Sequence, residues 1–348
     1  MSRLLSNPKA LTILVVTVVA ILVGVVGGAV GQAMGAGFLS SPLAQIELAA
    51  EPAFPKPLFG GWVITNSMLA TWLAIILILF LAWRSTRRLE EVPRGLQNFM
   101  EAIIEAGLHV AESVAGREKA RKFLPLVMTI FLFIVTANWL GVLPGFGTIG
   151  WLEPAEEVVK HAKEEGEPLT EVQVALFDDL GGIALLPFGS GDDVVTGEDV
   201  ENHAIPEGKT AGILIPFLRS ANTDVNTPLA IALVAMTIVQ YWGISTLGLF
   251  GHLSKFINFR SPIQLYVGLL EGISEFAKVI SFTFRLFGNI FAGEVLLFSM
   301  AFLIPLVGLV PFLGLELFVG FIQAFVFAML TLVFATMATV HHGGEEEH

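Results

Sequence analysis

The amino-acid sequence predicts an all-α polytopic membrane protein with about six hydrophobic spans, the two C-terminal ones long and tilted, and one amphipathic surface helix. Two observations predict this fold class. Hydrophobic residues make up 54% of the 348 and charged residues only 14%, whereas a soluble domain carries about a quarter charged residues. Several apolar runs also reach the roughly 20 residues needed to cross the hydrocarbon core of a bilayer.

The first span is expected at about 11–31, inside an N-terminal hydrophobic segment of residues 1–36 that begins with Arg3 and Lys9. A cleaved signal peptide is the alternative, because a basic start, an apolar core and small residues near 33–35 are typical of one. The apolar run is long for a signal peptide, so the sequence favours a retained helix.

Two further spans are expected within 62–143, one at 63–83 and one at 123–143. The first of them ends on the basic residues Arg84, Arg87 and Arg88. Between the two spans, apolar residues recur at i, i+3, i+4 spacing over 94–116, which is typical of an amphipathic helix lying on a membrane surface.

The segment 150–210 holds the net charge of the chain. It contains 15 Asp and Glu against 3 Lys, a net of −12 that equals the formal net charge of the whole chain. The sequence therefore indicates an acidic loop inserted between membrane spans, and it predicts no nucleic-acid partner.

The last membrane region is expected at 222–342, with spans at 228–250, 263–304 and 311–340. The 42 residues from Ile263 would form a helix of about 63 Å, roughly twice the hydrocarbon thickness, so this span should tilt strongly or break. Thr227 followed by Pro228 indicates a helix N-cap with proline at the first helical position.

Basic residues predict the orientation. With a cytoplasmic amino terminus, six crossings place twelve of the 19 Lys and Arg on the cytoplasmic side. The sequence thus predicts a multi-pass protein of the cell (plasma or inner) membrane, with both termini cytoplasmic and the acidic 150–210 loop external.

One arginine lies near the middle of an apolar span, in SFTFRLFGNIFAGE at 281–294. An arginine at mid-bilayer costs between about 2.5 and 17 kcal/mol, so Arg285 needs a partner, a water-filled cavity or a function. On a helix, five polar residues project within about 40° of Arg285: Glu271, Ser274, Lys278, Ser281 and Asn289. Glu294 projects to the opposite face, and Glu316 and Gln323 share a face of the final helix.

Simpler explanations exist for several of these residues. Lys278 could extend to the cytoplasmic edge of the membrane, and Glu271 and Glu275 could lie in the polar first turns of the span. Glu316 could pair with a charge on another subunit, and an Arg285–Glu294 ion pair is disfavoured by their opposite faces. The C-terminal histidines could chelate a metal, although a solvated tail is favoured: His341, His342 and His348.

Several motifs closely resemble subunit a of F-type ATP synthases. They are LLEGISEFAKVIS and FRLFGNIFAGE at 269–294, IQAFVFAMLTLVF at 322–334, NWLGVLPG at 138–145 and NTDVNTPLAIAL at 222–233. The resemblance covers about 62–342. It departs at Glu316, where other members can have histidine, and the segments 11–31 and 150–210 look like additions.

This resemblance implies a non-enzymatic stator that translocates H⁺, with Na⁺ as the alternative ion, against a rotating c-ring of small proteolipids. The implied partners are that ring, the subunit b peripheral stalk, the soluble F1 part and membrane lipid, with no cofactor and no metal. Arg285 looks like the essential arginine of the family, and Asp224, Glu271, Asn289, Glu294 and Gln323 match its polar positions. A secondary transporter whose Arg285 binds an anion, and a structural membrane protein, are the alternatives from other classes.

Overall fold

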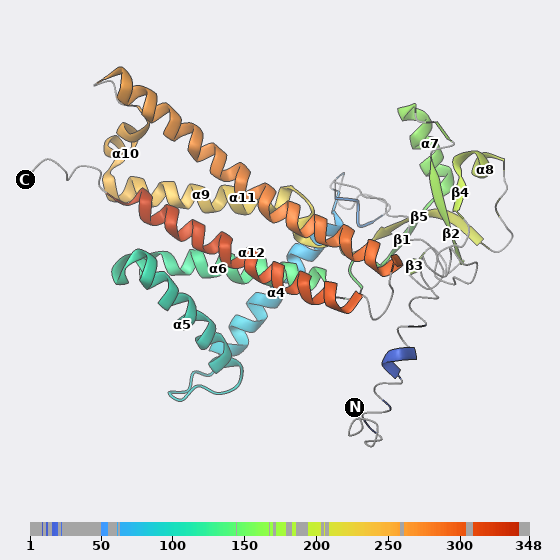
Figure 1. Cartoon of the computed structure of the whole chain (residues 1–348), viewed down its shortest axis with the longest axis horizontal. Coiled ribbons are helices and arrows are strands. Elements are labelled where there is room, and N and C mark those ends of the chain that lie inside the picture. Colours follow the sequence, from blue (N-terminus) through green and yellow to red (C-terminus); the bar gives the residue numbers. More distant parts are fainter. Residues whose placement is uncertain are drawn as a thin grey trace, which may run out of the picture. The chain divides into compact units, whose positions relative to one another are not determined.

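A computed structural model (Figure 1) describes most of the chain. It divides into two compact units, the first formed by Met1–Ala70, Leu140–Thr223 and Ile290–Phe318 and the second by Thr71–Trp139, Asp224–Asn289 and Val319–His348. The described residues are 9, 12, 16–19, 22, 50–54, 61, 63–143, 145–166, 168–169, 172–178, 183–185, 194–202, 205, 209–257, 261–303 and 309–340.

Five helices of the described residues are long and apolar enough to cross a membrane: α4 (Asn66–Thr86), α6 (Arg117–Gly141), α9 (Asn226–Leu247), α11 (Pro262–Leu303) and α12 (Leu309–Ala338). They confirm the predicted helical, multi-pass architecture. Each lies within a few residues of its predicted span, except that α6 begins six residues early. The span expected at 11–31 falls largely outside the described residues, of which 12, 16–19 and 22 are helical.

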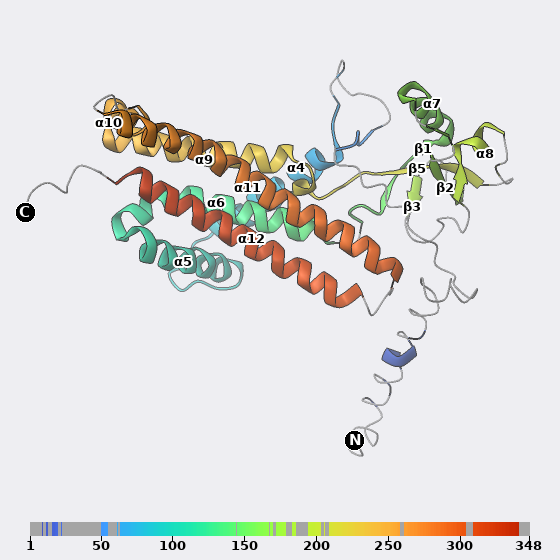
Figure 2. The ribbon, with the colours of Figure 1, turned by 45° about the horizontal axis from the view of Figure 1, so that its top comes forward.

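The second unit has its core where four helices meet, among them α5 (Leu96–Ala115), which matches the helix expected at 94–116. Figures 1 and 2 show α6, α9 and α12 running alongside one another. The buried cluster between them contains Phe123, Val239 and Leu332 together with the alanines 111, 120, 328 and 335. Small residues let helices approach closely in lipid, where no hydrophobic force drives them together. Close packing of the helices therefore holds this unit together.

The helix α11 runs unbroken over its 42 residues. The sequence left open whether this span tilts or breaks, and the structure shows that Gly272 and Gly288 do not interrupt the helix. The short helix α10 (Leu249–Phe256) precedes it and packs against α9. The residues of this helix up to Asn289 belong to the second unit, and those from Ile290 belong to the first.

The acidic segment, expected as a loop, contains a folded sheet. Five antiparallel strands have the order β3-β1-β5-β2-β4: β1 (Ile149–Pro154), β2 (Gln173–Asp178), β3 (Ile183–Leu185), β4 (Val194–Thr196) and β5 (Lys209–Pro216). The helices α7 (Ala155–Glu165) and α8 (Gly197–Glu201) accompany them. Val159, Val174, Leu176 and Val200 are buried in its core. The alternation at Val174 and Leu176 was the sequence signal for a strand, and the surrounding acidic residues concealed it.

The paired strands β1 and β5 lead to the residues near Arg219. Beyond the strand ends, the Phe217 N–H donates to the Ile149 carbonyl at 2.9 Å, and the Gly147 N–H donates to the Leu218 carbonyl at 2.8 Å. These bonds continue the ladder of β1 and β5 up to the residue before Arg219. The backbone that carries Arg219 is therefore fixed by the sheet.

Candidate functional site

The first unit contains a buried ion pair between Arg219 and Glu294. The guanidinium Nη2 and Nε each lie 3.4 Å from Glu294 Oε2, and the two side chains are 8% and 22% exposed. Arg219 is a residue of this site that the sequence did not predict. Glu294 was the available sequence signal for such a pair, because a carboxylate within an apolar segment requires a partner.

Glu316 of α12 packs against the backbone of α11 beside Glu294. A Cβ atom built on Gly293 would overlap the Glu316 carboxylate, so a larger residue at this position would have to displace that carboxylate. Glu316 is 9% exposed and is close enough to interact electrostatically with Glu294. The structure thus brings these two predicted site residues together within the first unit.

Replacing Arg219 with methionine should destabilise the protein strongly. The change leaves the Glu294 carboxylate buried without its partner, and breaking a buried pair in this way costs about 3–5 kcal/mol. Thermal unfolding of the purified protein measures the loss. The double variant Arg219→Met/Glu294→Met should regain most of the stability, and a double variant as unstable as the single one would contradict the pairing.

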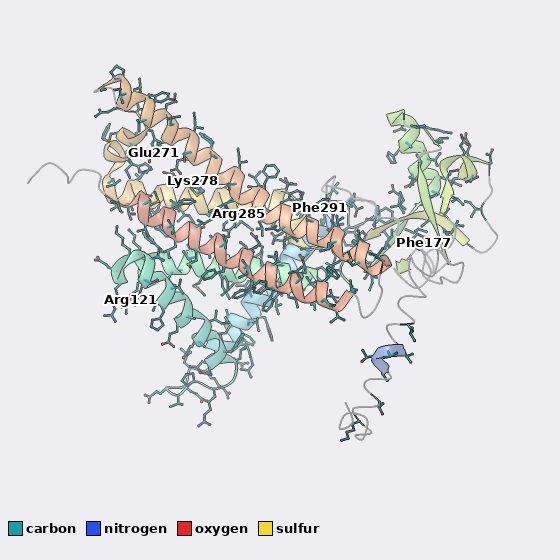
Figure 3. The ribbon with its side chains drawn as sticks, in the orientation of Figure 1. Arg121, Phe177, Glu271, Lys278, Arg285 and Phe291 are labelled. Atoms are coloured by element: carbon teal, nitrogen blue, oxygen red, sulfur yellow. The ribbon has the colours of Figure 1, made fainter. Side chains whose placement is uncertain are left out.

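In the second unit, a polar stripe follows α11. Figure 3 labels Glu271, Lys278 and Arg285, which succeed one another along this helix at intervals of seven residues. Arg285 is half-buried, and its Nη2 donates to Ser281 Oγ at 3.5 Å. Within the described part of the chain, no carboxylate forms an ion pair with Arg285.

The stripe borders two different faces of α11. On one side, Phe282 and Leu286 are each 1% exposed and pack into the unit. On the other side, Phe276 is 76% and Phe284 57% exposed. Arg285 therefore stands at the edge of an apolar face that no described residue of this chain covers.

Lys278 is held by an ion pair. Its Nζ lies 2.5 Å from Glu275 Oε1, both side chains are 22% exposed, and the ammonium also lies 4.6 Å from the Phe334 ring centroid. The remaining oxygen of Glu275 accepts from Gln240 Nε2 at 2.8 Å. In this structure Lys278 is paired with Glu275 inside the second unit. Glu275 and Gln240 are the residues of this group that sequence reasoning did not select.

The other predicted residues occupy separate positions. Asp224 is buried and accepts from the Asn226 N–H at 3.1 Å and from Asn226 Nδ2 at 3.0 Å. The helix α9 begins at Asn226 with Val225 as its N-cap and no side-chain cap bond. The predicted Thr227 cap is therefore wrong, because Asp224 takes the free N–H instead. The remaining predicted site residues are half-buried or exposed: Glu271, Ser274, Ser281, Asn289 and Gln323.

Candidate metal ligands do not gather in the described part of the chain. No group of three or more His, Asp or Glu residues there could hold an ion. The C-terminal histidines 341, 342 and 348 lie outside the described residues.

Comparison with known proteins identifies the family. The model of the family described as ATP synthase A chain matches residues 68–336. The ATP synthase subunit a of Gloeobacter violaceus is 31% identical over 277 residues, which cover 80% of this chain and 85% of that protein. Because the family match extends over well more than half of the sequence, this chain belongs to the ATP synthase A chain family.

Proposed function

We propose that this chain is the membrane stator of a rotary ATP synthase, and that it provides two half-channels for H⁺ or Na⁺ which Arg285 separates. Its partners are a rotating ring of proteolipids that each carry a carboxylate, a peripheral stalk built on subunit b, and the soluble part that makes ATP. The family membership supports the complex, and the polar stripe of α11 supports the mechanism.

One observation carries the proposal: the half-buried guanidinium of Arg285 has no carboxylate partner among the described residues and borders an uncovered apolar face. A cation at this depth requires compensation. A ring helix that packs on the exposed face, with its carboxylate directed at Arg285, supplies both the missing partner and the missing cover.

The chemistry of arginine explains its use at this position. A guanidinium stays protonated at any relevant pH, so it attracts an ionised carboxylate but cannot pass a proton onward. A ring carboxylate that arrives at Arg285 gives up its ion, and no ion leaks past. Rotation is then the only route between the half-channels. Each elementary charge that crosses 100 mV releases about 2.3 kcal/mol, so several ions drive the synthesis of one ATP.

Each half-channel has its own residues in this proposal. Glu294, Glu316, Gln323 and Asp224 line the external one, and Glu271, Ser274 and Ser281 line the cytoplasmic one. Lys278 and Asn289 lie beside the path. Both termini are cytoplasmic, the sheet formed from 150–210 is external, and α5 lies on the lipid surface.

Purification of the protein from its native membrane tests the proposal against its alternatives. A ring of small proteolipids and a soluble ATPase should co-purify with the chain. A secondary transporter would instead purify without them and bind an anionic substrate, and a structural protein would translocate no ion.

Cysteine accessibility should reveal a one-sided aqueous path on α11. The chain has no cysteine, so single replacements give an unambiguous signal. Small water-soluble thiol reagents should react quickly with cysteine placed at Glu271, Ser274, Ser281 or Asn289. They should react slowly at Phe282, which is buried, and at Phe284 on the apolar face. Equal labelling around the whole helix would rule out such a path.

A further inference from the structure

A buried histidine lies where α9, α10, α11 and α12 meet in the second unit. His252 of α10 is 5% exposed, and its ring packs against Gly243 of α9, where a Cβ would lie 2.7 Å from Cε1 and 2.9 Å from Nδ1. Phe256 contacts the same ring edge-on, with the centroids 5.5 Å apart. The imidazole therefore has little freedom to reorient.

His252 is the first member of a chain of polar contacts that ends at Lys278. Its Nε2 lies 2.7 Å from Gln240 Oε1, Gln240 Nε2 donates to Glu275 Oε2 at 2.8 Å, and Lys278 Nζ donates to Glu275 Oε1 at 2.5 Å. An ionised Glu275 only accepts, so the Gln240 amide nitrogen must face it and the amide oxygen must face His252. It follows that His252 donates and that Nε2 carries the ring proton.

In this tautomer Nδ1 carries no proton. The atom is buried and has no hydrogen-bond partner among the described residues. A second proton at Nδ1 would place a charge and an unsatisfied donor in the interior, which is costly. The neutral imidazole is thus the form that fits the site.

The charged groups that face the ring act in opposite directions. Burial has the largest effect and lowers the pKa of His252 from its ordinary 6.5, and Lys255 on the same helix lowers it further. Glu275 and Glu271 of α11 partly oppose this effect. From α9 the ring meets Gln240 and Gly243, and the Ala338 carbonyl of α12 accepts from Lys255 Nζ at 3.4 Å. Among the described residues, neither helix adds a charged group to those that act on the His252 ring.

We propose that His252 is a positioning residue for Lys278, and that it holds this cation on the α11 stripe only while its imidazole is neutral. The proposal rests on the function proposed for the stripe. The doubly protonated ring does not remain in this site, because its Nδ1–H would have no acceptor there. Gln240 then loses the Nε2–H donor of His252 and no longer orients Glu275, and the Glu275–Lys278 pair loosens. The position of the Lys278 ammonium, seven residues before Arg285, then depends on the pH to which α10 is exposed.

The sign of the pH dependence follows from the lowered pKa. The neutral ring contributes fully to stability above about pH 6.5. Its contribution declines as the pH falls from there to the lowered pKa, below which His252 is protonated and the hold on Lys278 is lost.

Amine labelling of Lys278 in the whole purified complex tests the proposal. An amine-reactive ester is applied from pH 8 to pH 5, and peptide mass spectrometry gives the labelling of Lys278 relative to the exposed Lys122 in the same chain. This ratio cancels most of the general effect of pH on amine reactivity. In the wild type it should stay low at pH 6.5 and above, and it should rise about threefold as the pH falls through the lowered pKa of His252 and the pair loosens.

Three variants separate positioning from simple packing. His252→Gln keeps a neutral donor and should hold the ratio low at every pH. His252→Phe keeps the ring volume without a donor and should raise the ratio at every pH. The control His109→Gln, at an exposed histidine of α5, should behave as the wild type. A wild-type ratio that stays flat, a pH rise that persists in His252→Gln, or a low ratio in His252→Phe would each overturn the proposal. Labelling requires no rotation, so these outcomes leave the ion path itself to the Arg285 test.

Discussion

Arg285→Ala is expected to abolish ATP-driven ion pumping while the complex still assembles. The half-buried side chain has only Ser281 as a hydrogen-bond partner among the described residues. Its removal should therefore eliminate the charge that separates the half-channels and leave the packing intact. Membrane vesicles should show no ATP-driven ion uptake, and they should show a passive leak because nothing separates the half-channels.

Arg285→Lys should fail as well. An ammonium is a point charge with a different reach, and unlike a guanidinium it can deprotonate when buried. Arg121→Ala is the matched control, since Arg121 is an exposed arginine on α6 and its loss should leave the pumping rate unchanged. Vesicles of either Arg285 variant that pump at the wild-type rate would refute the assignment.

Glu294 and Glu316 are expected to act as one functional pair. Both lie beside Gly293, and two carboxylates so close together share their titration instead of titrating independently. A pair of this kind can hold one proton and pass it inward. Glu294→Gln and Glu316→Gln should each slow ATP synthesis and change its dependence on external pH. The double variant should be little worse than the worse single one.

The pair is tested by ATP synthesis rates across an external pH series. Losses that multiply in the double variant would mean that the carboxylates act independently, and no loss would remove both from the ion path. Gly293→Ala offers a geometric test, because its Cβ must displace the Glu316 carboxylate and should reproduce the loss of Glu316→Gln. Gly314→Ala, where a Cβ meets nothing within 4 Å, is the control on the same helix as Glu316.

Local patterns were sufficient for the membrane helices. Whether a segment can span a bilayer depends on its length and apolar content, which are properties of neighbouring residues. The bounds of α4, α9, α11 and α12 accordingly lie within three residues of the expected spans. The stripe from Glu271 to Arg285 follows from the helical repeat alone, because residues of one regular helix have a fixed angular relation.

The sheet formed by β1 to β5 could not be predicted by the same reasoning. Its strands are short, and β1 pairs with β5 across some 60 residues of sequence, with Gly150 opposite Pro216. No local pattern indicates that two segments so far apart along the chain pair with each other, and the acidic residues around the strands resemble a solvated loop. The ladder that fixes the backbone before Arg219 could therefore only be read from the fold.

The sequence by itself determined the spans, the face that carries Arg285 and the family motifs, because each depends on residues that are close along one helix. Only the tertiary structure decided which groups pair with the buried charged and polar side chains. Arg219 joins Glu294 across 75 positions and Gln240 joins Glu275 across 35, and Glu316 packs on Gly293 of another helix. A buried charge is stabilised by whichever group the fold brings within a few ångströms of it, and helix packing brings together groups that the one-dimensional order keeps apart.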